Sequence, residues 1–307
     1  MKLRKTASKT WRIFKKAAIE FNEDNAIKLS ASLSYYTIFS LPPLCIIILS
    51  LCGVFFGREA VTGQFYGQIN GLVGNEAASQ IQETIKNMEL SNTSTFAMII
   101  GIIVLLIGAS GVFAEIQSSI NFIWGLKAKP NKGFRKFVQN RMMSFSMIGS
   151  MGFLLLVSLT INTFMDLLND RLVLIMPNTT VYLFYILNIV VVFLIITLLF
   201  SIIFKTLPDG KIAWKDTLIG SAVTAVLFML GKLGISLYLG NSTVASVYGA
   251  AGSIIIILVW VYYSAIILYF GAEFTKVYAH AYGKKIIPNA YAVEIKKEMF
   301  EIEPASD

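Results

Sequence analysis

Six long apolar stretches, uncharged except for one lysine, constrain this chain more than any other feature of its sequence. Each is close to the roughly 20 helical residues that cross the hydrocarbon layer of a membrane. Backbone polar groups inside a bilayer must bond within the protein, and continuous apolar runs lack the alternation of barrel strands, so the stretches predict helices. They are Leu29–Gly57, Ser91–Ala114, Met142–Met165, Val181–Phe204, Thr217–Gly240 (interrupted by Lys232) and Val244–Ala272.

The composition agrees with this interpretation. Hydrophobic residues make up 56% of the chain and charged residues only 14%, whereas soluble domains have about 45–50% and about 25%. The predicted fold class is therefore all-α: a polytopic membrane protein with a bundle of six transmembrane helices.

Lysine and arginine are divided unequally between the two sides of the predicted bundle. The segments on the side of the chain termini hold 22 of them, and the three opposite loops hold 3, namely Arg58, Lys86 and Arg171. Because loops rich in Lys and Arg stay on the cytoplasmic side, the N- and C-termini are predicted to be cytoplasmic.

Two segments outside the spans are also predicted to be helical. The N-terminal one is an amphipathic helix, expected to lie on an anionic leaflet, with a solvated cytoplasmic helix as the alternative. The other lies in the first outer loop, where apolar residues recur every four positions. The N-terminal apolar residues are Trp11, Phe14, Ala18 and Phe21; those of the outer loop are Ile69, Val73, Ala77, Ile81 and Ile85.

The domain organisation that follows is a single integral membrane domain over residues 1–307. It consists of a cytoplasmic amphipathic segment (1–28), the six-span bundle (29–274) and a cytoplasmic tail (275–307).

Charged groups within spans are expensive and are therefore candidate functional residues. Lys232 lies roughly 12 Å inside the outer end of the fifth stretch, at 1.5 Å per residue. We predict that it points into the bundle, close to Asp166 of the third stretch, and helps to hold an anionic group in an outward-facing polar cavity. The alternative is a lysine that snorkels to the outer headgroups.

Three further polar residues are candidates for a substrate cavity: Glu115, Asn121 and Glu273. Glu115 and Asn121 belong to a semi-polar stretch near the cytoplasmic end of the second span. Glu273 lies at the inner end of the last span, close to Lys276. A polar vestibule is the functional interpretation, and simple interfacial anchoring of the carboxylates is the alternative.

Soluble-enzyme chemistry finds little support in the residues. His280 is the only histidine, so a catalytic triad or a histidine-based metal site would depend on it alone. No Walker A pattern is present. The sequence therefore predicts a non-enzymatic protein with no cofactor, no metal and no nucleic-acid partner, whose partners are membrane lipids.

Two segments carry a resemblance to a known family. Asp24–Leu44 places a Tyr-Tyr pair before a proline-containing entry into the first span, and Tyr248–Glu273 is the more specific motif. Together with the six-span layout they resemble the YihY/BrkB family of bacterial inner-membrane proteins, which has often carried the label ribonuclease BN. The residues that match its motifs are Asp24, Tyr35, Tyr36, Pro43, Tyr248, Gly249, Trp260, Gly271 and Glu273.

The resemblance implies a multi-pass protein of the bacterial cytoplasmic membrane, in a family with proposed links to lipid or lipopolysaccharide export. The leading hypothesis is transporter-like handling of a lipid or an envelope component, with an anionic amphiphile as substrate. A non-transporting envelope scaffold or assembly factor is the alternative, and a membrane-tethered ribonuclease is disfavoured because no nuclease site is recognisable.

Overall fold

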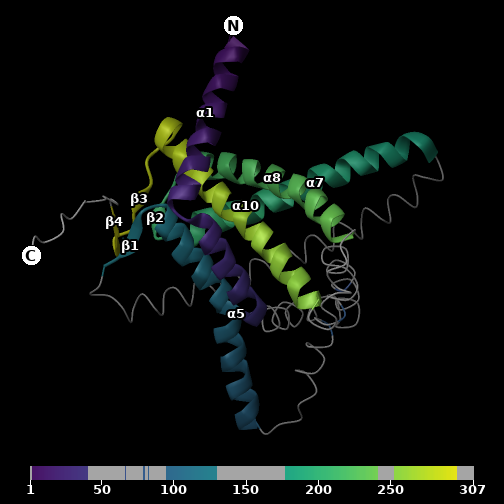
Figure 1. Ribbon diagram of the computed structural model, residues 1–307, viewed down its shortest axis with the longest axis vertical. Helices are drawn as coiled ribbons and strands as arrows, with labels where there is room; N and C mark the ends of the chain where they lie inside the picture. Colours follow the sequence, from purple (N-terminus) through teal and green to yellow (C-terminus); the bar gives the residue numbers. More distant parts are fainter. Residues whose placement is uncertain are drawn as a thin grey trace, which may run out of the picture.

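Helices dominate the computed structural model, which describes residues 2–40, 66, 79, 82, 95–129, 177–240 and 252–295 (Figure 1). The labelled helices are α1 (Lys2–Glu23), α5 (Thr95–Ile123), α7 (Pro177–Thr206), α8 (Trp214–Gly240) and α10 (Gly252–Tyr282). A further helix covers residues 26–40, directly after α1.

Three of these helices contain segments long and apolar enough to cross a membrane: Ile189–Thr206 in α7, Trp214–Ile235 in α8 and Ile255–Tyr282 in α10. They coincide with the predicted fourth, fifth and sixth spans, which confirms a helical membrane protein. The predicted second span falls largely within α5, and the start of the first within residues 26–40. The third predicted span lies outside the described residues, so the number six stays a prediction.

The last helix is longer than the sequence predicted. Instead of ending at Ala272, α10 continues to Tyr282 and contains 31 residues. At 1.5 Å per residue this is about 46 Å, well beyond the roughly 30 Å of bilayer hydrocarbon. Glu273 and Lys276 therefore lie in a regular helix and not at its end.

One end of the bundle collects most of the connections between elements. Here α1, α5, α7 and α10 end and α8 begins, and we call this region the polar end (Figure 1). Two short antiparallel pairs fasten the chain after α10 to it: β1 (Leu126–Ala128) with β4 (Ala292–Glu294), and β2 (Gly210–Lys211) with β3 (Ile287–Pro288). The mostly helical structure agrees with the all-α prediction, which did not include these four short strands.

The N-terminal segment is helical, and it packs against α10. Ile13 and Ala17 are buried, and the Phe14 ring lies 4.8 Å from that of Phe274, centroid to centroid. Trp11, assigned to the same apolar face from the sequence, is 72% exposed. The buried face is thus rotated from the predicted one, and placement on a membrane surface remains a prediction.

A bend separates α1 from the helix that follows. Asn25 has a φ of 51°, in the left-handed region that asparagine tolerates better than most residues. Its carbonyl accepts from the backbone N–H groups of Lys28 and Leu29, so the same residue ends one helix and starts the next. The bend lets residues 26–40 run beside α5.

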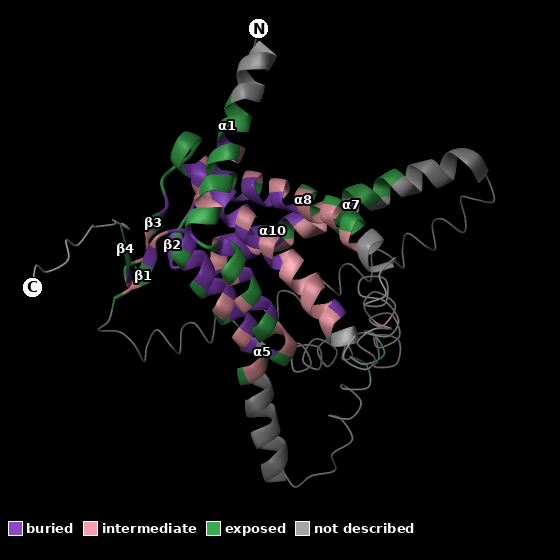
Figure 2. Cartoon of the chain, in the orientation of Figure 1, coloured by how far each residue is buried: buried purple, intermediate pink, exposed green. Residues whose placement is uncertain are grey.

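Helices α8 and α10 approach each other closely through glycines. A Cβ atom on Gly220 would lie 1.9 Å from Thr275 Oγ1, and one on Gly271 would lie 2.0 Å from Thr224 Oγ1. Each glycine therefore provides the space that a threonine on the facing helix fills. Buried residues gather where α1, α5, α8 and α10 meet (Figure 2).

Candidate functional site

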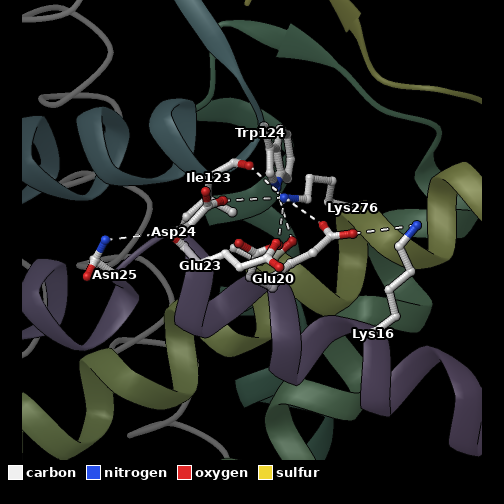
Figure 3. A network of polar contacts seen from close by, with 10 residues as sticks. Lys16, Glu20, Glu23, Asp24, Asn25, Ile123, Trp124 and Lys276 are labelled. Carbon is white, nitrogen blue, oxygen red and sulfur yellow. Dashed lines mark hydrogen bonds and ion pairs between the residues drawn. The ribbon is translucent and has the colours of Figure 1, made fainter. Parts of the chain in front are cut away.

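The most concentrated group of charges in the described chain surrounds Lys276 of α10 (Figure 3). Its ammonium Nζ lies 2.7 Å from Glu273 Oε2, 2.9 Å from Glu20 Oε2 and 3.5 Å from Asp24 Oδ2. It also donates to the carbonyl of Ile123 over 2.8 Å. We call these five residues the Lys276 network.

Local sequence explains how three elements bring these groups together. Glu20 and Asp24 are four residues apart at the end of α1, and Glu273 and Lys276 are three apart on α10, so each pair shares a helix face. Gly125, with a φ of 65°, ends α5. Because α5 ends here, the Ile123 carbonyl has no N–H of a following helical turn to accept from. Lysine side chains commonly donate to such terminal carbonyls.

The network is buried by protein. Glu273 is fully buried, Asp24 is 8% exposed and the Lys276 side chain is 12% exposed. Oε1 of Glu273 has no hydrogen-bond donor in the part of the chain that the structure describes. Burying a charge is costly unless it is paired, so three carboxylates around one ammonium form an unusual concentration of negative charge.

A second buried carboxylate lies in the turn between α7 and α8. Asp209 is fully buried, and its oxygens accept from Gln117 Nε2 at 3.1 Å and from Asn121 Nδ2 at 3.0 Å. Its backbone N–H donates to Asn121 Oδ1 over 2.7 Å. Asn121, predicted as a cavity residue, is therefore a clamp that fixes this turn to α5.

A row of polar contacts extends from the Lys276 network along one face of α5. Its members recur every four residues: Gly111 lies against Ser40, Glu115 Oε1 accepts from Ser32 Oγ over 2.7 Å, and Ser119 lies beside the Tyr269 hydroxyl. Ile123 completes the row through its bond to Lys276. We call this row the polar track; from Gly111 to Ile123 it covers about 18 Å of helix.

The polar track contains hydroxyl groups with unused bonding capacity. Tyr269 and Ser119 are both buried, yet among the described residues neither side-chain oxygen has a hydrogen bond of good geometry. Buried polar groups of this kind commonly bond to ordered water or to a ligand. Glu115, partly buried beside them, adds an ionisable group.

The other predicted site residues are distributed less simply. Lys232 is exposed on α8, between the exposed Leu230 and Leu233. Its predicted partner Asp166 lies outside the described residues, so the proposed pair stays a prediction.

The family-motif residues fall into three groups. Asp24, Gly271 and Glu273 belong to the contacts described above. Tyr35 and Tyr36 are 61% and 47% exposed, with ring centroids 6.0 Å apart, and Trp260 packs on Phe228. Pro43, Tyr248 and Gly249 lie outside the described residues, as does most of the predicted outer-loop helix, of which residues 79 and 82 are described, both as helical.

Sequence reasoning did not identify Glu20 and Asp209 as site residues, and it treated Lys276 only as a neighbour of Glu273. The four-residue spacing of Glu20 and Asp24, beside the buried apolar face of α1, was the available signal. Within the described ranges, no group of three or more His, Cys, Asp or Glu side chains is arranged to hold a metal ion.

Long apolar helices joined by buried charges and hydroxyls define a helical membrane protein with a polar interior at one end of its bundle. Comparison with known proteins gives the family: the Virulence factor BrkB model matches residues 17–293, so the chain belongs to that family. No solved structure matches the chain.

The curated relatives are bacterial membrane proteins. A UPF0761 membrane protein of Pseudoalteromonas atlantica is 28% identical, over 86% of this chain and 85% of the relative. One from Saccharophagus degradans is 25% identical over 88% of this chain, and one from Alkalilimnicola ehrlichii is 24% identical over 85%. The alignments with these last two cover only 61% and 57% of the relatives' lengths.

Proposed function

We propose that this membrane protein handles a lipid or another amphiphilic envelope component in a transporter-like manner. In this proposal it lies in the bacterial cytoplasmic membrane with both termini inside. Its substrate is an anionic amphiphile, whose headgroup is accommodated among polar side chains of the bundle and whose acyl chains stay in the bilayer.

The polar track is the observation that carries this proposal. Glu115 lies eight residues, or about 12 Å, from the Ile123 end of the track. A carboxylate, a tyrosine and several serines on facing helices are costly inside a membrane protein and typically mark a pathway for a polar group. The hydroxyls of Ser119 and Tyr269 lie beside each other and have no hydrogen bond of good geometry among the described residues, so they offer donors of the kind that a headgroup needs.

A specific observation favours the alternative function of an envelope scaffold. The Lys276 ammonium and the Asp209 carboxylate are bonded within the protein, each to groups on other helices. Polar groups that bond to each other across two helices are what a helix-to-helix crosslink requires. The two functions therefore differ in the role of Glu115 and its neighbours: a pathway in one case and a crosslink in the other.

Reconstitution into liposomes distinguishes the two. Transbilayer movement of a fluorescent anionic lipid and flux of a soluble anion are measured for the intact chain, for Glu115→Gln and for Lys232→Ala. Transport requires lipid movement above that of empty liposomes and a clear loss in Glu115→Gln, whereas the control Glu23→Gln, exposed on α1, keeps full activity. Movement no faster than in empty liposomes would refute transport and leave the scaffold.

A further inference from the structure

We propose that Asp24 and Glu273 form a proton-binding site, in which the two carboxyl groups share one proton at the junction of α1 and α10. This inference is separate from the proposed transport, because it concerns how the chain holds its own helices together.

The two acids are held at the same ammonium group. Lys276 Nζ lies 2.7 Å from Glu273 Oε2 and 3.5 Å from Asp24 Oδ2, which brings the two carboxyl groups close to each other. Ionised carboxylates are acceptors only. Two of them held against one ammonium repel each other, and one proton shared between them removes that repulsion.

Burial makes full ionisation of this group of acids costly. Glu273 is fully buried, and its Oε1 has no donor among the described residues. The single Lys276 ammonium is shared by three carboxylates, and buried negative charge beyond what one ammonium offsets costs more than a neutral carboxylic acid, which favours binding of a proton. Asp24, at 8% exposure, is in much the same surroundings.

Charged groups from three elements surround the two acids. From α1, Glu20 and Lys16 face the site, with Lys16 Nζ 3.5 Å from Glu20 Oε1. From α10 come Lys276 and, further along, His280, whose own neighbours include Glu294 and Lys285. From α5 the site receives the Ile123 carbonyl, and the Trp124 indole N–H bonds to the Ala272 carbonyl beside Glu273.

One shared proton brings these charges into balance. The acid pair then carries a single negative charge, Glu20 carries a second, and the ammonium groups of Lys276 and Lys16 match them. Without the proton, an additional negative charge stands between α1 and α10 in a site with little access to water. Proton release is therefore coupled to loosening of α1 from α10, the contact made by Phe14 and Phe274.

Infrared difference spectroscopy tests the site directly. The full chain in lipid nanodiscs is titrated from acid to alkaline pH, and the carbonyl stretch of protonated carboxylic acids, well separated from the carboxylate bands, is followed. We expect a titrating acid band that is lost in Glu273→Gln and retained in the control Glu23→Gln, whose side chain is exposed one residue before Asp24.

The same titration of Asp24→Asn is the second measurement. If Glu273→Gln does not fold, Asp24→Asn tests the site by itself. An asparagine amide donates a hydrogen bond to Glu273, which then no longer requires the proton, so the acid band is expected to disappear here too. A band unchanged in Glu273→Gln refutes the site. A band that persists in Asp24→Asn refutes sharing between the two acids.

Discussion

Replacing Lys276 with methionine tests whether the Lys276 network holds the polar end together. Methionine retains the length and the apolar stem of the side chain and removes only the ammonium. That ammonium lies within 4 Å of three carboxylates and donates to the Ile123 carbonyl. Its loss leaves Asp24 and Glu273 close to each other without the ammonium that they share.

The expected magnitude follows from the burial of the partners. The side chains of Glu273, Asp24 and Glu20 are 0%, 11% and 24% exposed, so the pairs are not ordinary surface salt bridges. Removing one partner of a buried ion pair costs about 3–5 kcal/mol. Because the acids can relieve their repulsion by binding protons, we expect a loss of about 3 kcal/mol, near the lower limit of that range.

The assay is an equilibrium unfolding titration with sodium dodecyl sulfate in mixed micelles, followed by far-ultraviolet circular dichroism. The matched control is Lys285→Met, which changes an exposed lysine shortly after the end of α10. This variant should unfold as the wild type does. Adding Glu273→Gln to Lys276→Met should restore part of the lost stability, since it removes the charge left without a counterion. If Lys276→Met unfolds within about 0.5 kcal/mol of the wild type, like an exposed ion pair, the network does not stabilise the fold.

Four further predictions concern packing, topology and activity. Gly220→Ala should destabilise the α8–α10 contact by roughly 1–3 kcal/mol through overpacking. Gly234→Ala, where no atom of the described residues lies within 4 Å of the added Cβ, should be nearly neutral in the same titration. A cysteine placed at Asn75 should react with an impermeant reagent in intact cells and one at Asn131 should not, and the opposite labelling would reverse the predicted orientation. Purified protein should not cleave RNA with or without Mg²⁺ or Zn²⁺; metal-dependent cleavage that is lost on substitution of one carboxylate would show a nuclease. Lys232→Met should impair function while leaving insertion intact, and a fully active variant would identify a snorkelling lysine.

The sequence was sufficient for the helices because their signal is local. Long apolar runs report on span positions without any knowledge of neighbours. Helices α7 and α8 begin and end within about four residues of the predicted bounds, whereas α10 ends ten residues after the predicted Ala272. The short strands were missed since two-residue pairs such as Gly210–Lys211 with Ile287–Pro288 have no periodicity that a sequence can display.

The site was predicted only in part because its contacts join distant positions. Asp209 follows Pro208 and precedes Gly210, which locally is typical of an exposed turn, yet amides 88 and 92 residues earlier bury its carboxylate. Glu273 was identified as a candidate, but its partner acid on the N-terminal segment depends on α1 packing against α10. No local pattern specifies that contact, although the Glu20–Asp24 spacing is compatible with it.

The depth of the Lys276 network in the bilayer follows from α1 and α10 together. Lys15 and Lys16 of α1 are exposed, so that helix requires water or headgroups around it, and it packs on α10 from Phe270 onwards. The part of α10 before this contact, from Gly252 to Phe270, is about 28 Å long at 1.5 Å per residue, which matches the hydrocarbon thickness of about 30 Å. We therefore expect Glu273 and Lys276 to lie just beyond the hydrocarbon, where protein and not lipid removes them from water, and Glu115, about 12 Å further along α5, to lie within it. Protons would then reach the Lys276 network from the aqueous side without crossing the bilayer. A spin label or a fluorescent quencher of known depth would measure this difference, and equal depths for positions 115 and 276 would contradict the argument.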